Sequence, residues 1–455
     1  MERTIAAVAT PKGAGGISVI RISGSEAVKI GASVFSRPDE IKNAESHTIH
    51  YGFIVDGEKK IDEVLVSIMK APRTYTGEDV VEINSHGGVV VTNKVLDAVI
   101  KAGAYPAEPG EFTKRAFING KMDLTRAEAV IDLINAKNEL SRKNAFSQLE
   151  GSLGDKITGV RQKLVNLAAN MQVAIDYPDE DLEDVTRDDI VRVLKECKND
   201  IDRLIKSSEN GRIVSEGIST AIVGKPNVGK SSLLNMLSGY ERAIVTDIAG
   251  TTRDIITENV TLDGIPLALF DTAGIHETED AVEKIGVSRS QQAIENSDLI
   301  VMLVDASTDI EDEDRDILKS VKDKKHIIAV NKTDKKENLD KSVYSSFADG
   351  SPIVFISAKS GDGLSELSEK IKEMFKLGEL ESENNTVITN MRHKTALYNA
   401  YESIVAAVEA MEAGVPQDII TIDMNNAMDS LGEITGATIS QDVVSEIFHR
   451  FCVGK

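Results

Sequence analysis

Residues 224–232 carry the pattern most directly tied to chemistry. They match the phosphate-loop pattern G-x-x-x-x-G-K-[ST] at every fixed position. In such a loop Lys230 reaches the terminal phosphates of a nucleotide, and the Ser231 hydroxyl holds a magnesium ion. The apolar run 219–223 predicts a buried strand before the loop, and leucines at helical spacing predict a helix after it. A strand, a glycine loop and a helix N-terminus together direct backbone N–H groups toward phosphate oxygens.

Three further short motifs follow in order, each after an apolar run that predicts a strand. The first, 271–274, reads Asp-Thr-Ala-Gly, and its aspartate can reach the magnesium ion through water. The second, 331–334, reads Asn-Lys-Thr-Asp. Its last carboxylate can accept hydrogen bonds from N1 and N2 of guanine, and adenine lacks the matching donors. The third, 357–359, reads Ser-Ala-Lys and is the second base-contacting loop. A loop over 244–254 supplies Thr252 to complete the magnesium shell.

Together these motifs predict a Ras-like α/β GTPase domain whose nucleotide is GTP, with Lys230 and Asp271 among its catalytic groups. The predicted GTP-binding residues are Asn227, Val228, Gly229, Lys230, Ser231, Ser232, Thr246, Asp247, Ile248, Ala249, Gly250, Thr251, Thr252, Asp271, Thr272, Ala273, Gly274, Asn331, Lys332, Asp334, Ser357, Ala358 and Lys359.

One absence in the sequence bears on the mechanism. Ras-like enzymes often carry a glutamine after the Asp-x-x-Gly motif, where it orients the attacking water. This chain has Ile275 there, so another group must position the water. No arginine finger is identified either, because Arg253 is merely nearby.

The composition limits what these motifs can belong to. A chain of 455 residues suggests about three domains. The net charge of -22 weighs against non-specific nucleic-acid binding, although a local basic cluster could still hold RNA. No apolar run approaches the ~20 residues of a membrane span. Two cysteines cannot form a disulfide framework, so a cytoplasmic location is expected.

Residues 1–119 predict a mixed α+β domain with a hairpin at Asp56-Gly57. A glycine loop over 12–16 lacks the full dinucleotide spacing, so we interpret it as a tight turn. Arg21 and Glu82 each interrupt an apolar strand. Taken alone, such charges mark the solvent face of an alternating pattern.

Residues 120–215 and 379–455 predict helices with single apolar faces, which need partners. We therefore expect one helical domain built from both segments, with the GTPase domain of residues 216–378 inserted into it. Cys197 lies on an apolar stripe and is expected to be buried, and 207–217 is expected to be a linker. The final Cys-Val-Gly-Lys is either a frayed tail or a small functional arm.

Besides the GTPase motifs, the chain carries a set of short segments along its whole length: Ala9-Thr10-Pro11, Gly15-Gly16, Arg21-Ile22-Ser23-Gly24, Gly77-Glu78-Asp79-Val80, His86-Gly87-Gly88, Pro109-Gly110-Glu111-Phe112, Arg115-Ala116-Phe117 and Phe451-Cys452-Val453-Gly454-Lys455. On these residues the chain resembles, over essentially its whole length, the MnmE (TrmE) family of tRNA modification GTPases, with Val453 where that family commonly has isoleucine.

The resemblance implies a reaction. The family works with the flavoprotein MnmG, in a heterotetramer or larger complex. Together they add an aminomethyl or carboxymethylaminomethyl group to the 5-carbon of the wobble uridine of certain tRNAs. The one-carbon donor, 5-formyltetrahydrofolate or methylenetetrahydrofolate, would bind the N-terminal domain. By motif, Arg21, Glu82, Lys121 and Lys455 would contact it.

The resemblance also implies a potassium-dependent homodimer that associates through its G domains, with the N-terminal domain as a further dimerisation domain. A potassium ion at the phosphates can neutralise charge as an arginine finger would. Its ligands would be the Asn227 side chain and backbone carbonyls around Thr246, Ile248 and Thr251. Glu283 would orient the water, although alone it is an ordinary helix carboxylate.

Three alternatives stay open at this point. A ribosome-assembly GTPase, an RNA-binding switch without one-carbon chemistry, would share every GTPase motif. A scaffold would use GTP only structurally. Cys452 could act as a nucleophile toward the uridine ring, but no activating group is visible beside it in the sequence.

Overall fold

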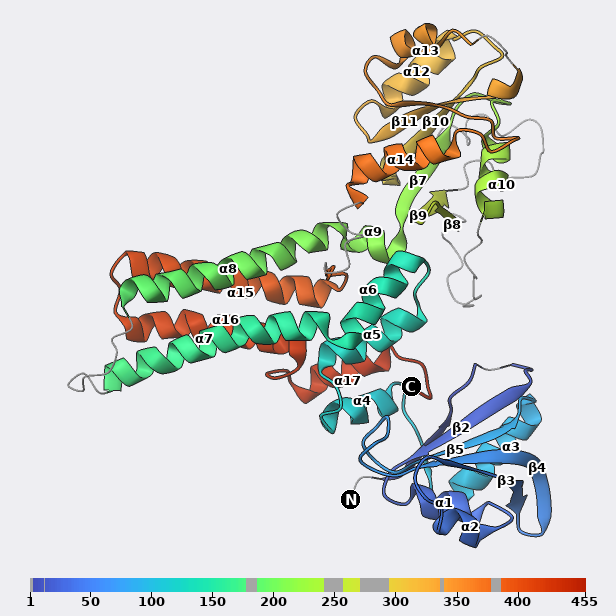
Figure 1. Ribbon diagram of the computed structural model, residues 1–455, viewed down its shortest axis with the longest axis vertical. Helices are drawn as coiled ribbons and strands as arrows, with labels where there is room; N and C mark the ends of the chain where they lie inside the picture. Colours follow the sequence, from blue (N-terminus) through green and yellow to red (C-terminus); the bar gives the residue numbers. More distant parts are fainter. Residues whose placement is uncertain are drawn as a thin grey trace. The chain divides into compact units, whose positions relative to one another are not determined.

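The computed structural model describes residues 3–11, 13–176, 186–240, 257–270, 294–335, 339–377 and 386–455 (Figure 1). The chain divides into two compact units. The first comprises Met1–Ile131, Gln148–Val193 and Ala406–Lys455, and the second comprises Asp132–Ser147 and Leu194–Val405.

The first unit contains a six-stranded sheet of order β3-β4-β5-β2-β1-β6. All neighbouring strands are antiparallel except β1 and β6. Its elements are β1 (Ile5–Val8), β2 (Ile17–Ser23), α1 (Ala27–Ser33), α2 (Pro38–Lys42), β3 (Thr48–Asp56), β4 (Lys59–Met69), β5 (Val80–His86), α3 (Val89–Lys101), β6 (Tyr105–Pro106) and α4 (Glu111–Ile118).

The alternating pattern of these strands buries one face of the sheet. Inward side chains such as Ile20, Val66 and Ile83 join residues of α1 and α3 in one core. The predicted hairpin is confirmed, because β3 and β4 are joined by a turn in which Gly57 has φ 64°. Gly15 N of the glycine loop donates to Gly87 O at 3.0 Å, so the loop is held to the segment that follows β5.

Helices dominate the segments on either side of the nucleotide domain. They are α5 (Leu124–Ile134), α6 (Glu139–Glu150), α7 (Ser152–Asp176), α8 (Arg187–Ser207), η1 (Ser208–Asn210), α9 (Gly211–Glu216), α15 (Met391–Glu412), α16 (Gln417–Thr435) and α17 (Gln441–His449).

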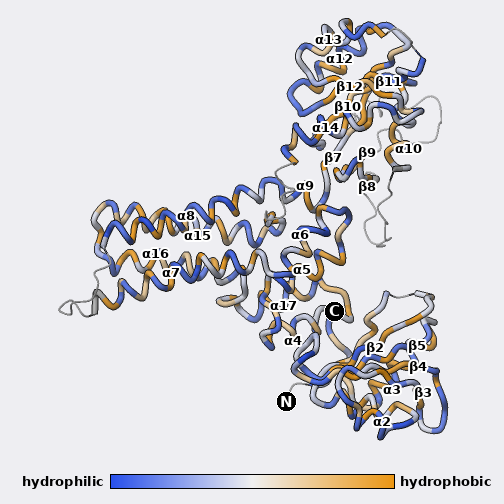
Figure 2. The backbone as a smooth tube through the Cα atoms, viewed as in Figure 1, coloured by the Kyte–Doolittle hydropathy of each residue, from blue (hydrophilic) through white to orange (hydrophobic). Residues whose placement is uncertain are grey.

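The long helices pair across large distances in the sequence. In the first unit α7 lies along α16, and Arg161 Nε donates to Met428 O at 3.2 Å (Figure 1). In the second unit the Lys198 ammonium lies 5.7 Å from the ring centre of Tyr401. Apolar and polar residues alternate along these helices, as single-faced packing requires (Figure 2). Cys197 is fully buried, as predicted.

The expected linker at 207–217 is wrong, because η1 and α9 occupy it. Ile213 and Val214 of α9 are buried, so packing overrides the low helix propensity of a segment rich in serine and glycine.

The nucleotide domain, in the second unit, has a six-stranded sheet of order β12-β11-β10-β7-β9-β8. Neighbouring strands are parallel except β8 and β9. Its elements are β7 (Ile218–Val223), α10 (Lys230–Tyr240), β8 (Thr257–Leu262), β9 (Ile265–Phe270), β10 (Leu299–Asp305), α12 (Asp312–Val321), β11 (His326–Asn331), η2 (Thr333–Lys335), α13 (Lys341–Ala348), β12 (Ile353–Phe355) and α14 (Leu364–Phe375).

Helices cover both faces of this sheet. Leu233 and Leu237 of α10 join α14 in one core, whereas Tyr344 and Phe347 of α13 join Val321 of α12 in the other. Because a parallel sheet is buried on both faces, its strands are continuous apolar runs. All seven residues of β10 are buried.

Candidate functional site

The phosphate loop joins β7 to α10, as predicted, and its glycines are required by close contacts. Gly224 has φ 148°, and a Cβ there would lie 2.5 Å from Leu303 O. Gly229 has φ 103°, and a Cβ there would lie 2.3 Å from the side-chain nitrogen of Asn331. Neither position can carry a side chain without displacing its neighbours.

Lys230 is the first residue of α10. Its ammonium donates to Gly224 O at 2.6 Å and to Lys225 O at 2.8 Å, so the lysine folds back over the loop. Burial lowers the pKa of Lys230. A cation in this position would gain from the negative charge of a nucleotide phosphate.

Asn331 links the phosphate loop to the loop of residues 357–359. Its side chain is buried, its Nδ2 donates to Val228 O at 2.8 Å, and its Oδ1 accepts from Ala358 N at 2.9 Å. Asp334 is exposed, and its Oδ1 accepts from Ser357 Oγ at 2.9 Å. These bonds bring three motifs, predicted separately, to the carboxyl ends of β7, β11 and β12, where ligands bind in open α/β sheets.

Much of the predicted GTP site lies outside the described residues. These positions are Thr246, Asp247, Ile248, Ala249, Gly250, Thr251, Thr252, Asp271, Thr272, Ala273, Gly274 and Glu283, together with Ile275 and Arg253. The described members are Asn227 to Ser232, Asn331, Lys332, Asp334 and Ser357 to Lys359.

A second site lies in the first unit. Arg21 on β2 stands opposite Glu82 on β5, and Arg21 Nε donates to Glu82 Oε1 at 2.8 Å. Their side chains are only 16% and 24% exposed. The interpretation of these charges as a plain solvent face is therefore wrong, because the chain's last residues cover this part of the sheet.

The final segment docks on the N-terminal domain. Arg21 Nη1 donates to Gly454 O at 3.5 Å, and Gly110 N donates to Cys452 O at 3.3 Å. Gly454 has φ 98°, and a Cβ there would lie 2.3 Å from Val8 O. Burial, and then the charge of Arg21, lower the pKa of Lys455. The tail is thus an ordered arm, which excludes the frayed alternative, and it brings Lys455 to Arg21 and Glu82.

Lys121, the fourth residue expected to contact the one-carbon donor, makes contacts of a different kind. Lys121 Nζ donates to Pro72 O at 3.0 Å, and a Cβ on Gly77 would lie 3.4 Å from the Lys121 stem. Lys121 thus braces the loop of residues 70–79, and this contact does not join it to the Arg21 cluster.

Two aromatic residues beside Arg21, Tyr75 and Phe112, were not predicted from the sequence. The Arg21 guanidinium lies 5.5 Å from the ring centre of Tyr75 and 5.6 Å from that of Phe112. Burial raises the pKa of Tyr75. Rings at this distance from a guanidinium make cation–π contacts, which hold the Arg21 side chain in one place. Phe112 lies in the quoted Pro-Gly-Glu-Phe motif, which was the available signal.

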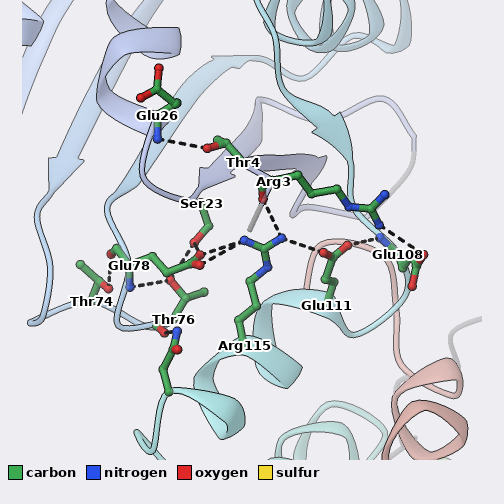
Figure 3. Close-up of polar contacts among 11 residues, drawn as sticks. Arg3, Thr4, Ser23, Glu26, Thr74, Thr76, Glu78, Glu108, Glu111 and Arg115 are labelled. Atoms are coloured by element: carbon green, nitrogen blue, oxygen red, sulfur yellow. Dashed lines mark hydrogen bonds and ion pairs between the residues drawn. The ribbon is translucent and has the colours of Figure 1, made fainter. Parts of the chain in front are cut away.

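The loop that carries Tyr75 is anchored by a buried arginine (Figure 3). Arg115 Nη1 donates to both carboxylate oxygens of Glu78 at 3.1 Å, and Arg115 Nη2 donates to Glu111 Oε1 at 2.8 Å. Ser23 Oγ donates to Glu78 Oε2 at 2.8 Å. These charges are paired and hydrogen-bonded, as buried charges must be.

Across the described ranges, no helix has the length and apolar character needed to cross a membrane. Neither cysteine is in a disulfide: Cys197 is buried and Cys452 is exposed.

A phosphate loop at the end of a parallel strand, with the Asn331–Asp334 and Ser357–Lys359 motifs beside it, is the arrangement of a P-loop GTPase. Two family models match the chain. The N-terminus of the GTP-binding protein TrmE matches residues 4–121, and the MnmE helical domain matches residues 124–452. The chain therefore belongs to the MnmE family of tRNA modification GTPases.

Curated relatives agree along the whole chain. The tRNA modification GTPase MnmE of Acetivibrio thermocellus is 49% identical over 100% of this chain and 99% of its own length. That of Clostridioides difficile is 47% identical over 100% of both chains. Among solved structures, Aquifex aeolicus Era bound to GDP and aluminium fluoride is 31% identical, with a TM-score of 0.29; the match covers 40% of this chain and 65% of that one.

Proposed function

We propose that the protein hydrolyses GTP to drive modification of the wobble uridine of tRNA. With an MnmG-type flavoprotein, it takes part in adding an aminomethyl or carboxymethylaminomethyl group to the 5-carbon of that base. The observation that carries the proposal is the presence of two sites in one chain. One is the phosphate loop, which Asn331 holds by a hydrogen bond, and the other is the cluster of Arg21, Glu82 and Lys455.

The Arg21 cluster is proposed to hold a tetrahydrofolate carrying a one-carbon unit. A folate has a flat polar ring and anionic carboxylates, so it needs both placed charges and apolar walls. Arg21 and Lys455 supply cations, Glu82 supplies an acceptor, and Tyr75 and Phe112 supply rings. Lys121 would join from the loop of residues 70–79. The folate supplies the one-carbon unit, and these residues bind and orient it.

The phosphate loop is proposed to bind GTP with Mg²⁺ and K⁺. Ser231 at the start of α10 and Thr252 would hold magnesium. Asn227 would hold potassium with backbone carbonyls of Thr246, Ile248 and Thr251. Asn227 suits this role because it is exposed at the loop and its side chain carries an amide oxygen. Among the remaining groups, Lys230 would contact the phosphates, Asp271 would reach magnesium through water and Glu283 would orient the attacking water.

We propose domains over 1–119, 120–215, 216–378 and 379–455, with the third domain inserted into a helical domain made of the second and fourth. Contacts between the two flanks support this. Ile388 N donates to Ser207 Oγ at 3.3 Å, and Val387 N donates to Asn144 Oδ1 at 3.1 Å. Chain entry to and exit from the nucleotide domain are thus adjacent.

The protein is proposed to work as a cytoplasmic homodimer. Exposed apolar side chains on the open face of the N-terminal sheet support a dimer contact there, in addition to one through the G domains. Ile49, Tyr51 and Leu65 are 66%, 54% and 46% exposed, and Tyr51 and Leu65 are register partners on β3 and β4. Large apolar patches on soluble domains commonly mark association surfaces.

A ribosome-assembly GTPase would share the nucleotide site, but it performs no one-carbon chemistry and would not need the Arg21 cluster. The direct test is nucleoside analysis of tRNA from cells lacking this protein. We expect loss of the 5-substituted wobble uridine and its restoration by the wild-type chain. Unchanged modification would overturn the proposal.

A further inference from the structure

Asp305 ends β10 at the edge of the sheet where the phosphate loop lies. It pairs in register with Asn331, the last residue of β11, and Ala306 N donates to Asn331 O at 2.8 Å. Its side chain is 9% exposed. The motifs read from the sequence left this residue without a role.

Both carboxylate oxygens of Asp305 are engaged. Its Oδ1 accepts from Ser307 N at 2.8 Å and from Ser307 Oγ at 2.6 Å. Its Oδ2 accepts from Lys332 Nζ at 2.5 Å. Burial acts to raise the pKa of Asp305, but the bonds from Lys332 and Ser307 prevail and hold it below its ordinary value. The group is therefore an anion, fixed on one side by Ser307.

The same lysine reaches the phosphate loop. Lys332 Nζ also donates to the backbone oxygen of Asn227 at 2.6 Å. Asn227 and Lys332 have φ 62° and 64°, a left-handed backbone that non-glycine residues rarely adopt. Such a conformation persists where surrounding contacts determine it. A lysine is a flexible point charge, so a fixed carboxylate is needed to hold it over one carbonyl.

We infer that Asp305 is a positioning residue of the phosphate loop, which acts through Lys332 on the backbone of Asn227. It sets the nucleotide affinity of the loop without itself touching the nucleotide. The inference rests on the proposed function in one respect: Asn227 is also the proposed potassium ligand, so Asp305 would tune the potassium requirement as well.

A double-mutant cycle tests this on the full-length protein, with a fluorescent GDP analogue titrated in sodium buffer. Asp305→Asn keeps the shape and removes the charge, and we expect GDP affinity to fall about ten-fold, the worth of one charge-assisted hydrogen bond. Lys332→Gln should weaken binding by at least as much. In the Lys332→Gln background, Asp305→Asn should add nothing, because its effect passes through the lysine.

Asp316→Asn is the matched control. Asp316 is 73% exposed and pairs with Lys319 at 2.9 Å on the surface of α12, so GDP affinity should stay at the wild-type value. If Asp305 only shapes the turn at 305–308, its effect and that of Lys332→Gln will add, and the inference is overturned. The same holds if Asp305→Asn binds GDP as the wild type does.

Ser307→Ala keeps the inference testable if Asp305→Asn does not fold. It removes one donor to the carboxylate and leaves the Lys332 pair intact. We expect a loss of GDP affinity of about three-fold that disappears in the Lys332→Gln background; an additive loss would contradict the inference. Potassium titration of the wild-type GTPase rate is a separate arm: a rate independent of potassium removes the proposed cation site, whereas the GDP cycle still decides the role of Asp305.

Discussion

Arg21 and Glu82 face one another on neighbouring strands, and Arg21 Nε lies 2.8 Å from Glu82 Oε1. The pair is partly buried, although both residues interrupt apolar strands at positions where an alternating pattern faces solvent. The C-terminal segment packs against this pair, since Arg21 also donates to Gly454 O, 433 residues away in the sequence. The cluster therefore exists only when the first and last segments are docked together.

Gly454 should be essential to that docking. A side chain at its φ of 98° would meet Val8 O at 2.3 Å, so Gly454→Val should displace Lys455 from the cluster. We expect affinity for 5-formyltetrahydrofolate to fall about ten-fold, measured by calorimetry, through loss of one charge-assisted contact. Val453→Ala, at an exposed neighbour, should bind normally. Equal binding by the Gly454 variant would show that the tail does not contribute to the site.

Potassium should accelerate GTP hydrolysis. A cation at the phosphates stabilises developing charge in the transition state, so we expect at least about a ten-fold higher rate in potassium than in sodium. Asn227→Ala should abolish the difference, whereas Asn235→Ala, exposed further along α10, should retain it. Equal rates of phosphate release in the two salts would remove potassium from the mechanism.

Glu283 should act on the rate and not on binding. A carboxylate that orients the attacking water contributes on the order of 10²-fold, so Glu283→Ala should slow single-turnover hydrolysis by that factor with nearly unchanged GTP affinity. Glu295→Ala is a control at an exposed glutamate of the same domain. If the Glu283 variant turns over normally, the water is positioned by another group.

The parts of the site that were predictable from sequence are those set by local spacing. Gly224 to Ser231 act through a single turn between a strand and a helix, so their order along the chain specifies their geometry. Asn331 and Ser357 could be placed near them because parallel strands end at one edge.

The remaining features depend on contacts between distant segments. No local pattern indicates that Gly454 packs on Val8, that Tyr75 and Phe112 flank Arg21, or that Asp305 holds Lys332. Burial of Arg21 likewise depends on tertiary packing, which an alternating strand pattern does not encode. Ile213 lies in a helix for the same reason, because the core it joins is built from other segments.

The central claim is that one chain combines a GTPase with a folate site centred on Arg21, and titration of 5-formyltetrahydrofolate into the full-length protein tests it most directly. We predict saturable binding by the wild type and by Arg37→Ala, a variant of an exposed arginine on the same domain. Arg21→Ala, which loses the bond to Glu82 and the contact with the tail, should bind at least about ten-fold more weakly. Absence of binding to the wild type, or equal binding by Arg21→Ala, would contradict the account.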